Sequence, residues 1–93
     1  MLNVDEIFSR AYAAIEQKKT SDPERYELLK FRVDVESVPY RYLQLALYQS
    51  FYTKDELRGC VDEFAGIVEK AGILGMDTFG GMEEIIEGFR SAL

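Results

Sequence analysis

Residues 53–72 read TKDELRGCVDEFAGIVEKAG, and this regular stretch gives the clearest indication of the fold. It opens with a capping box, in which the Thr53 hydroxyl accepts a hydrogen bond from the first helical turn and Glu56 reaches back to the Thr53 N–H. Gly72 is predicted to end the helix, because a residue just past a helix often needs a positive φ. Seven apolar residues between these signals follow the spacing of one helical face: Leu57, Cys60, Val61, Phe64, Ile67, Val68 and Ala71.

The preceding residues, 21–52, predict the central helix of a small bundle. Ser21 or Asp22 as the cap and Pro23 at the first helical position form a strong start signal, because proline's missing N–H has no helical partner there. Two adjoining apolar stripes indicate burial of more than half the circumference. One stripe contains Tyr26, Leu29, Val33, Tyr40, Leu43 and Leu47, and the other contains Leu28, Phe31, Val35, Val38, Tyr42 and Leu45.

The middle of this segment is open to two interpretations. Residues 31–36 alternate apolar and charged side chains, which also suits a half-buried strand. We favour a helix, because a lone strand has no partner elsewhere in the chain and because a helix brings Arg32 and Glu36 together as an i,i+4 pair. Pro39 disrupts a continuous helix, so we expect a kink or break near it, with the helix resuming through Tyr52.

The two ends of the chain complete an all-α fold. Asn3 and Glu6 mark the start of an amphipathic helix that extends to Lys19. Residues 73–81 contain three glycines and predict a loop, and residues 82–93 predict a short last helix. Three apolar side chains of the loop are expected to seal one end of the core: Leu74, Met76 and Phe79. We therefore predict one domain over residues 1–93, a compact bundle of four to five helices with a kink or break near Pro39.

The charge balance excludes two classes of partner. The chain has 93 residues, with 11 basic and 17 acidic side chains, no histidine and a net charge of −6. This balance argues against binding to nucleic acid and against docking on an anionic membrane surface. No apolar run is long enough to cross a bilayer, and residues 1–6 do not begin a secretory signal. We expect a cytoplasmic protein or a piece of a larger one.

The sequence offers little for catalysis. Without histidine the commonest general base is missing, and one cysteine excludes a disulfide framework and a Cys-rich zinc site. Cys60 lies on an apolar stripe, where a thiol is normally a small core residue. The adjacent carboxylate pairs are interpreted as helix caps and solvated faces, so we predict no metal, no cofactor and no enzyme activity of the chain alone.

Four charged residues surround the expected break: Arg32, Asp34, Glu36 and Arg41. They belong to the helix with the widest apolar coverage, so some of them must be partly buried, and buried charges need partners. We favour a structural ion-pair cluster around Pro39. A polar binding site is the alternative.

Five aromatic residues lie within thirteen positions: Tyr40, Tyr42, Tyr48, Phe51 and Tyr52. By the stripes above, Tyr40 and Tyr42 are expected to point into the core. Tyr48 and Tyr52 are four residues apart and are expected to share an edge of the helix that can be exposed. Because tyrosine combines a flat apolar face with a polar rim, this edge is a candidate contact for a protein or a glycan, and simple core packing is the alternative.

Residues 25–48, followed by 52–57, contain an Arg-Val-acid run, a helix rich in leucine and tyrosine, and a second helix opened by Thr53 and acidic residues. This pattern resembles the carboxyl-terminal helical region of large bacterial glycoside-hydrolase-like proteins related to the α-glucuronidases. The resemblance covers residues 25–73, about half of the chain. It implies an accessory module packed against a carbohydrate-active barrel in an exported protein. The catalytic carboxylates of such proteins lie on the barrel, so no catalytic residue is carried over.

Two hypotheses follow for the function. The first is a non-catalytic helical accessory or interaction domain of a larger carbohydrate-active protein. The second is a free-standing, small, acidic cytoplasmic protein that binds or regulates another protein. Both predict a protein partner or an adjoining domain, and the first adds a possible glycan contact at Tyr48 and Tyr52.

Overall fold

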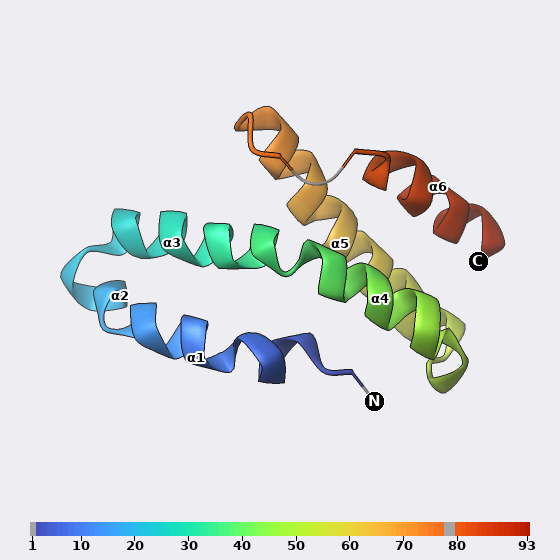
Figure 1. Cartoon of the computed structure of the whole chain (residues 1–93), viewed down its shortest axis with the longest axis horizontal. Coiled ribbons are helices and arrows are strands. Elements are labelled where there is room, and N and C mark those ends of the chain that lie inside the picture. The colour runs from blue at the N-terminus through green and yellow to red at the C-terminus, as the bar shows by residue number, and fades with distance from the viewer. Residues whose placement is uncertain (1, 78–79) are drawn as a thin grey trace.

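The computed structural model describes residues 2–77 and 80–93, and every regular element within these ranges is a helix (Figure 1). The elements are α1 (Val4–Glu16), α2 (Lys18–Ser21), α3 (Pro23–Glu36), α4 (Val38–Tyr48), the 3₁₀ helix η1 (Gln49–Phe51), α5 (Lys54–Ile73) and α6 (Met82–Ala92). Five of the described helices have at least 11 residues, which confirms the predicted all-α bundle. None of the helices in these ranges is long and apolar enough to cross a membrane.

Helix α5 begins at the predicted capping box. The Thr53 hydroxyl accepts from the Glu56 N–H at 3.2 Å, and the Glu56 carboxylate accepts from the Thr53 N–H at 3.4 Å. The helix continues through Ile73, so the end predicted at Gly72 is wrong by one residue. The glycine that needs a positive φ is Gly75, with φ 72°, where the chain leaves the helix and turns back.

Residues 31–36 are helical, and the break near Pro39 is confirmed. Helix α3 ends at Glu36, and Ser37 separates it from α4. Pro39 lies in the first turn of α4, where the missing N–H leaves no intrahelical hydrogen bond unmade. The two helices are not collinear, and Figure 1 shows α4 tilted away from the axis of α3.

Two helices are shorter than the sequence predicts. Helix α4 ends at Tyr48, after which η1 leads to Tyr52 in an extended conformation, with φ −117° and ψ 149°. Thr53, the N-cap of the next helix, also has extended backbone angles, as N-cap residues normally do. The helical conformation of α4 and η1 therefore ends before it. Helix α1 ends at Glu16 rather than Lys19, and the one-turn helix α2 follows it.

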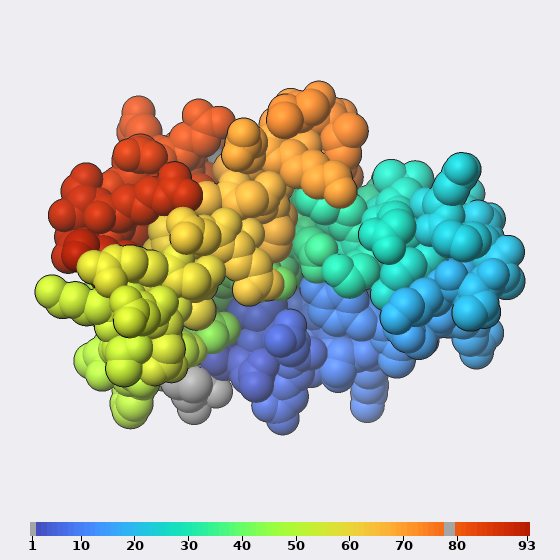
Figure 2. Space-filling model, turned by 180° about the vertical axis from the view of Figure 1, so that it is seen from behind, coloured from blue at the N-terminus to red at the C-terminus, as the bar shows by residue number. Residues whose placement is uncertain are grey.

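The helices form a flat arrangement of 43 × 29 × 19 Å. Helix α5 lies behind α4 in Figure 1 and in front of it in Figure 2, so α5 packs against one broad side of α4. Helix α1 runs antiparallel to α3 and α4. Contacts along the pair show this direction: the Val4 N–H bonds the Gln44 side chain, the Phe8 ring meets Tyr40, and the Tyr12 hydroxyl bonds Asp34.

The hydrophobic core lies where α3, α4, α5 and α6 meet. Its buried members among the described residues are Phe31, Val35, Val38, Leu45, Val61, Phe64, Ile67, Val68, Ala71 and Ile86. Met76 packs against this core, as predicted for the glycine-rich loop. Leu74 is exposed, so its predicted role in sealing the core is wrong, and Phe79 lies outside the described residues.

Candidate functional site

A partly buried polar cluster joins α3, α4 and α5 at the break between the first two. Its centre is Ser37, which is 0% exposed. The Ser37 hydroxyl donates to the backbone carbonyl of Asp34 and accepts from Nε of Arg41 at 2.8 Å. Arg41 also reaches α5, where its Nη1 lies 3.2 Å from Oε1 of Glu63. The cluster therefore fixes the relative positions of three helices.

Helix α1 enters the same cluster through Tyr12. The Tyr12 hydroxyl donates to Oδ1 of Asp34 at an O–O distance of 2.5 Å, and Oδ2 of Asp34 lies 3.9 Å from Nζ of Lys30. The Asp34 side chain is largely buried, and a buried carboxylate requires such partners because its removal from water is costly. Asp34 thus connects α1 to α3.

The pKa of the Tyr12 phenol is raised from 10.0 to about 12. Burial is the main cause, because it disfavours the charged phenolate. The hydrogen bond to Asp34 and the negative charge of Asp34 act in the same direction, whereas Arg41 opposes them. At neutral pH Tyr12 therefore remains a protonated donor.

The structure places the four charged residues singled out in the sequence in two environments. Asp34 and Arg41 lie in the polar cluster and are linked through Ser37. Arg32 and Glu36 are exposed, and neither takes part in an ion pair between described residues. Only the two residues that face the neighbouring helices are brought together.

Sequence reasoning missed three members of the cluster: Tyr12, Ser37 and Glu63. Tyr12 and Glu63 lie 22 residues away from Asp34 and Arg41, respectively, and no local pattern connects them. Ser37 carried a usable signal, because a serine at a helix break two residues before a proline readily bonds the backbone of the preceding turn.

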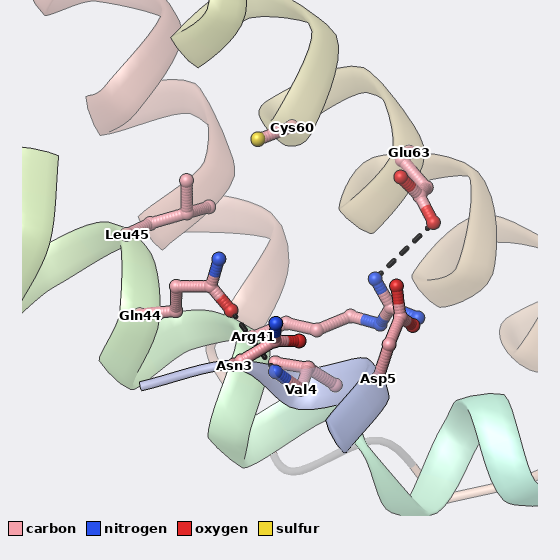
Figure 3. Close-up of a pocket in the computed structure, with 8 residues that line it drawn as sticks. All are labelled: Asn3, Val4, Asp5, Arg41, Gln44, Leu45, Cys60 and Glu63. Carbon is pink, nitrogen blue, oxygen red and sulfur yellow. Dashed lines mark hydrogen bonds and ion pairs between the residues drawn. The ribbon is translucent and has the colours of Figure 1, made fainter. Parts of the chain in front are cut away.

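A cleft of about 180 Å³ opens beside this cluster, between the start of α1, α4 and α5 (Figure 3). Figure 3 shows Arg41 extending across it to Glu63 on α5. The Gln44 side chain, which lines the cleft, makes two hydrogen bonds: its oxygen accepts from the Val4 N–H at 3.4 Å, and its nitrogen donates to the Tyr52 hydroxyl at 2.6 Å. The lining residues are Asn3, Val4, Asp5, Arg41, Gln44, Leu45, Cys60 and Glu63.

Two groups that line the cleft, the Arg41 guanidinium and the Cys60 thiol, have environments that can be described. The Arg41 guanidinium is engaged by Ser37 and Glu63. Burial raises the pKa of the Cys60 thiol, and Glu63 adds to the effect, so the thiol is protonated at neutral pH and is a weak nucleophile. Among the described residues, no three cysteine or carboxylate side chains converge in a group that could hold a metal ion.

Tyr48 and Tyr52 do not share a helical edge, because α4 ends between them. Both side chains are half-buried. The Tyr48 ring packs at 6.1 Å from the ring of Phe51, and the Tyr52 hydroxyl accepts from Gln44 in the wall of the cleft. The polar rim of Tyr52 is therefore already used within the chain.

Four apolar side chains of α4 and η1 remain exposed, and they lie on the side of α4 that faces away from the core. We define the outer face of α4 by Tyr40, Leu43, Leu47 and Phe51, which are 40%, 42%, 64% and 72% exposed. Their spacing of three or four residues places them on one helical face and its continuation into η1. Leu45, on the opposite side of α4, is buried in the core. Tyr40 was expected to point inward. It lies instead at one edge of this face, where its ring also packs edge-on against Phe8 of α1 at 5.2 Å.

The outer face of α4 is also free of charge. Residues 38–52 contain a single charged side chain, Arg41, which is 14% exposed and turned toward Glu63 on α5. The chain as a whole has 30% charged residues, so this segment of fifteen residues carries fewer charges than the average of the chain. Water-exposed helical surfaces normally carry charged residues, so the outer face resembles a surface that is covered by protein.

No protein-family model matches this chain, and neither a curated protein nor a solved structure shows significant similarity to it.

Proposed function

We propose that this chain is a non-catalytic helical module that acts by contact, and that it binds a protein partner or an adjoining domain through the outer face of α4. One observation carries the proposal: α4 is apolar on the side that faces solvent as well as on the side that faces the core. A helix that is apolar all round is normally enclosed by protein on all sides. Here α5 packs against one side and leaves Leu43, Leu47 and Phe51 in contact with water.

The contents of the cleft support the non-catalytic part of the proposal. A nucleophile needs an adjacent base or a lowered pKa, and the pKa of Cys60 is raised. The charge of Arg41 is compensated by Glu63. These side chains are arranged to hold α4 against α5.

The resemblance of residues 25–73 gives this module a context. In the first form of the proposal it is an accessory domain of an exported, carbohydrate-active protein, and the outer face of α4 packs on an adjoining part of the assembly. In the alternative form it is a free-standing acidic interaction protein of the cytoplasm. The full reading frame distinguishes them: a barrel encoded upstream of Met1 favours the first form, and a stop codon there favours the second.

Photo-cross-linking in the producing cells tests the contact surface. A benzophenone amino acid replaces Leu47 on the outer face of α4, and in a matched control it replaces Leu28, which is similarly exposed on α3. We expect cross-linked protein products from position 47 and at least tenfold less product from position 28. Equal yields, or no product from position 47, would contradict the proposed contact surface.

The glycan contact is tested on the same purified protein. Oligosaccharides that contain uronic acid are added while the ring resonances of Tyr48 and Tyr52 are followed by NMR. Shifts at both tyrosines would assign a glycan contact to this end of α4. Unchanged spectra would leave protein contact as the function of the module.

A further inference from the structure

We propose that the outer face of α4 binds a second copy of this chain, and that the two copies pack as a two-fold dimer with their α4 helices antiparallel. This inference rests on the proposed function, because it names the partner of the same surface. Three observations support it: the amount of exposed surface, the distribution of charge, and the order of side chains along the face.

The chain exposes more surface than a protein of its size requires. Its accessible area is 6336 Å². A monomer of 10.7 kDa typically exposes about 5,500 Å². Part of this excess lies on the outer face of α4, which carries four of the eight exposed large hydrophobic side chains among the described residues. The radius of gyration agrees, because 14.1 Å exceeds the value of about 12 Å expected for 93 compact residues.

The charge distribution favours a second copy over a basic partner. A basic partner is normally met by a rim of carboxylates, whereas residues 38–52 contain no acidic residue. Two copies of net charge −6 repel at long range, yet none of the residues that form the outer face of α4 is a carboxylate. The contact therefore removes apolar side chains from water without burying an unpaired charge.

The order of side chains along the face suits an antiparallel pair. The face has an aromatic residue at each end, Tyr40 and Phe51, and two leucines, Leu43 and Leu47, between them. A two-fold axis at the middle of this face places Leu43 against Leu47 of the partner subunit and Tyr40 against Phe51 of the partner subunit. Such isologous contacts match each apolar group with another, and they add the Phe51 ring of the partner subunit to the edge-on pair that Tyr40 makes with Phe8 of its own chain.

Sedimentation equilibrium of the purified chain from about 1 to about 500 µM tests the dimer. We expect a mass that rises toward twice 10.7 kDa, with a dissociation constant on the order of 10 µM because the interface is small. The double variant Leu43→Glu/Leu47→Glu should remain monomeric over this range. Its far-UV circular dichroism should be unchanged, because both side chains are exposed in the single chain.

A matched control places the same change on other exposed apolar residues. The double variant Leu28→Glu/Ile73→Glu lies on α3 and α5, outside the outer face of α4, and should dimerise as the unchanged chain does. Loss of the dimer in this control, or its persistence in Leu43→Glu/Leu47→Glu, would overturn the proposed interface.

Mixing two single variants tests the antiparallel register. Leu43→Lys and Leu47→Glu should each weaken association, and an equimolar mixture should associate at least threefold more tightly than either variant alone, because one contact then pairs Lys with Glu. No gain on mixing would overturn this register.

The dimer and the proposed function fail in different ways. A chain that stays monomeric at about 500 µM overturns the dimer. If position 47 then cross-links to a different protein in cells, the outer face of α4 remains a contact surface. If position 47 gives no product, both the dimer and the proposed function are wrong.

Discussion

Tyr12 and Ser37 show how single hydroxyl groups determine where whole helices lie. Each is placed between helices and not within the apolar core: Tyr12 joins α1 to Asp34 on α3, and Ser37 joins α3 to Arg41 on α4. A buried donor or acceptor that loses its partner costs about 1 to 3 kcal/mol, so these bonds favour one arrangement over others of similar apolar burial.

Replacing Tyr12 by Phe should lower the free energy of unfolding by about 1 to 2 kcal/mol at pH 7, because the carboxylate of Asp34 loses a hydrogen-bond donor. Urea titration followed by circular dichroism measures this difference. Tyr48→Phe is the control, because the Tyr48 hydroxyl makes no hydrogen bond to another described residue, and its change should stay within about 0.5 kcal/mol.

The difference in unfolding free energy between the unchanged protein and Tyr12→Phe should depend on pH, with a sign that the Tyr12 pKa determines. The pKa of Tyr12 is about 12 in the folded chain and 10.0 as the reference for the unfolded chain, so unfolding releases a proton between these values. The contribution of Tyr12 is therefore complete below pH 10 and is lost as the pH rises toward 12. The difference between the unchanged protein and Tyr12→Phe should shrink over this window. A constant difference would show that the Tyr12 pKa is not raised.

The break between α3 and α4 shows how two short helices position a site that one long helix would not. Ser37 keeps helical backbone angles, with φ −77° and ψ −10°, so the chain bends without a loop. The bend directs the Arg41 side chain toward Glu63 on α5 and leaves Tyr40 and Leu43 on the outer side. Pro39 contributes by removing one N–H, whereas Ser37 supplies the hydrogen bonds that hold the bend.

Pro39→Ala should change the free energy of unfolding by less than about 1 kcal/mol. The variant gains an N–H that can extend the helical bonding, and it loses the stiffness that proline gives the unfolded chain, and these effects oppose each other. Helicity by far-UV circular dichroism should be equal or slightly higher. Ser37→Ala is the contrasting variant and should lose about 2 kcal/mol, because Arg41 loses a buried acceptor. A larger loss in Pro39→Ala than in Ser37→Ala would mean that proline holds the bend.

The whole molecule is flat and acidic. Its flat shape leaves apolar surface uncovered and so favours association, whereas its net negative charge opposes association. An extent of 19 Å in the shortest dimension leaves α4 covered by α5 on one broad side, as Figures 1 and 2 show from opposite sides. Association across the uncovered side would bury apolar surface. The net charge of −6 on each copy acts over longer distances and disfavours it.

Association should therefore tighten when salt screens this repulsion. Raising sodium chloride from about 20 mM to about 500 mM shortens the screening length from roughly 20 Å to under 5 Å. We expect the dimer dissociation constant, measured by sedimentation equilibrium, to fall at least threefold. Leu43→Glu/Leu47→Glu should stay monomeric at both salt concentrations, which separates screening from general salt-induced association. Weaker association at high salt would indicate opposite charges paired across the contact.

Local patterns in the sequence were sufficient for the helices and for most of their starts. The capping box at Thr53, the Asp22-Pro23 signal and the 3.6-residue spacing depend on neighbours within one or two turns, so they can be read without the fold. Helix ends were less accurate, at Gly72 and at Tyr52, because the end of a helix depends on what the next segment must do. The end of α5 was set by the turn at Gly75, and the end of α4 by the cap of α5.

The polar cluster and the outer face of α4 depend on contacts between distant segments. The spacing of Tyr40, Leu43 and Leu47 shows that they share a stripe, but the same spacing is found in a core, and they are exposed only because α5 packs on the opposite side of α4. Likewise, the charged residues near Pro39 were recognisable in the chain, but the pairing of Arg41 with Glu63 required two helices to meet. Periodicity records which residues share a surface, and the packing of one helix on another determines which surfaces are left to water.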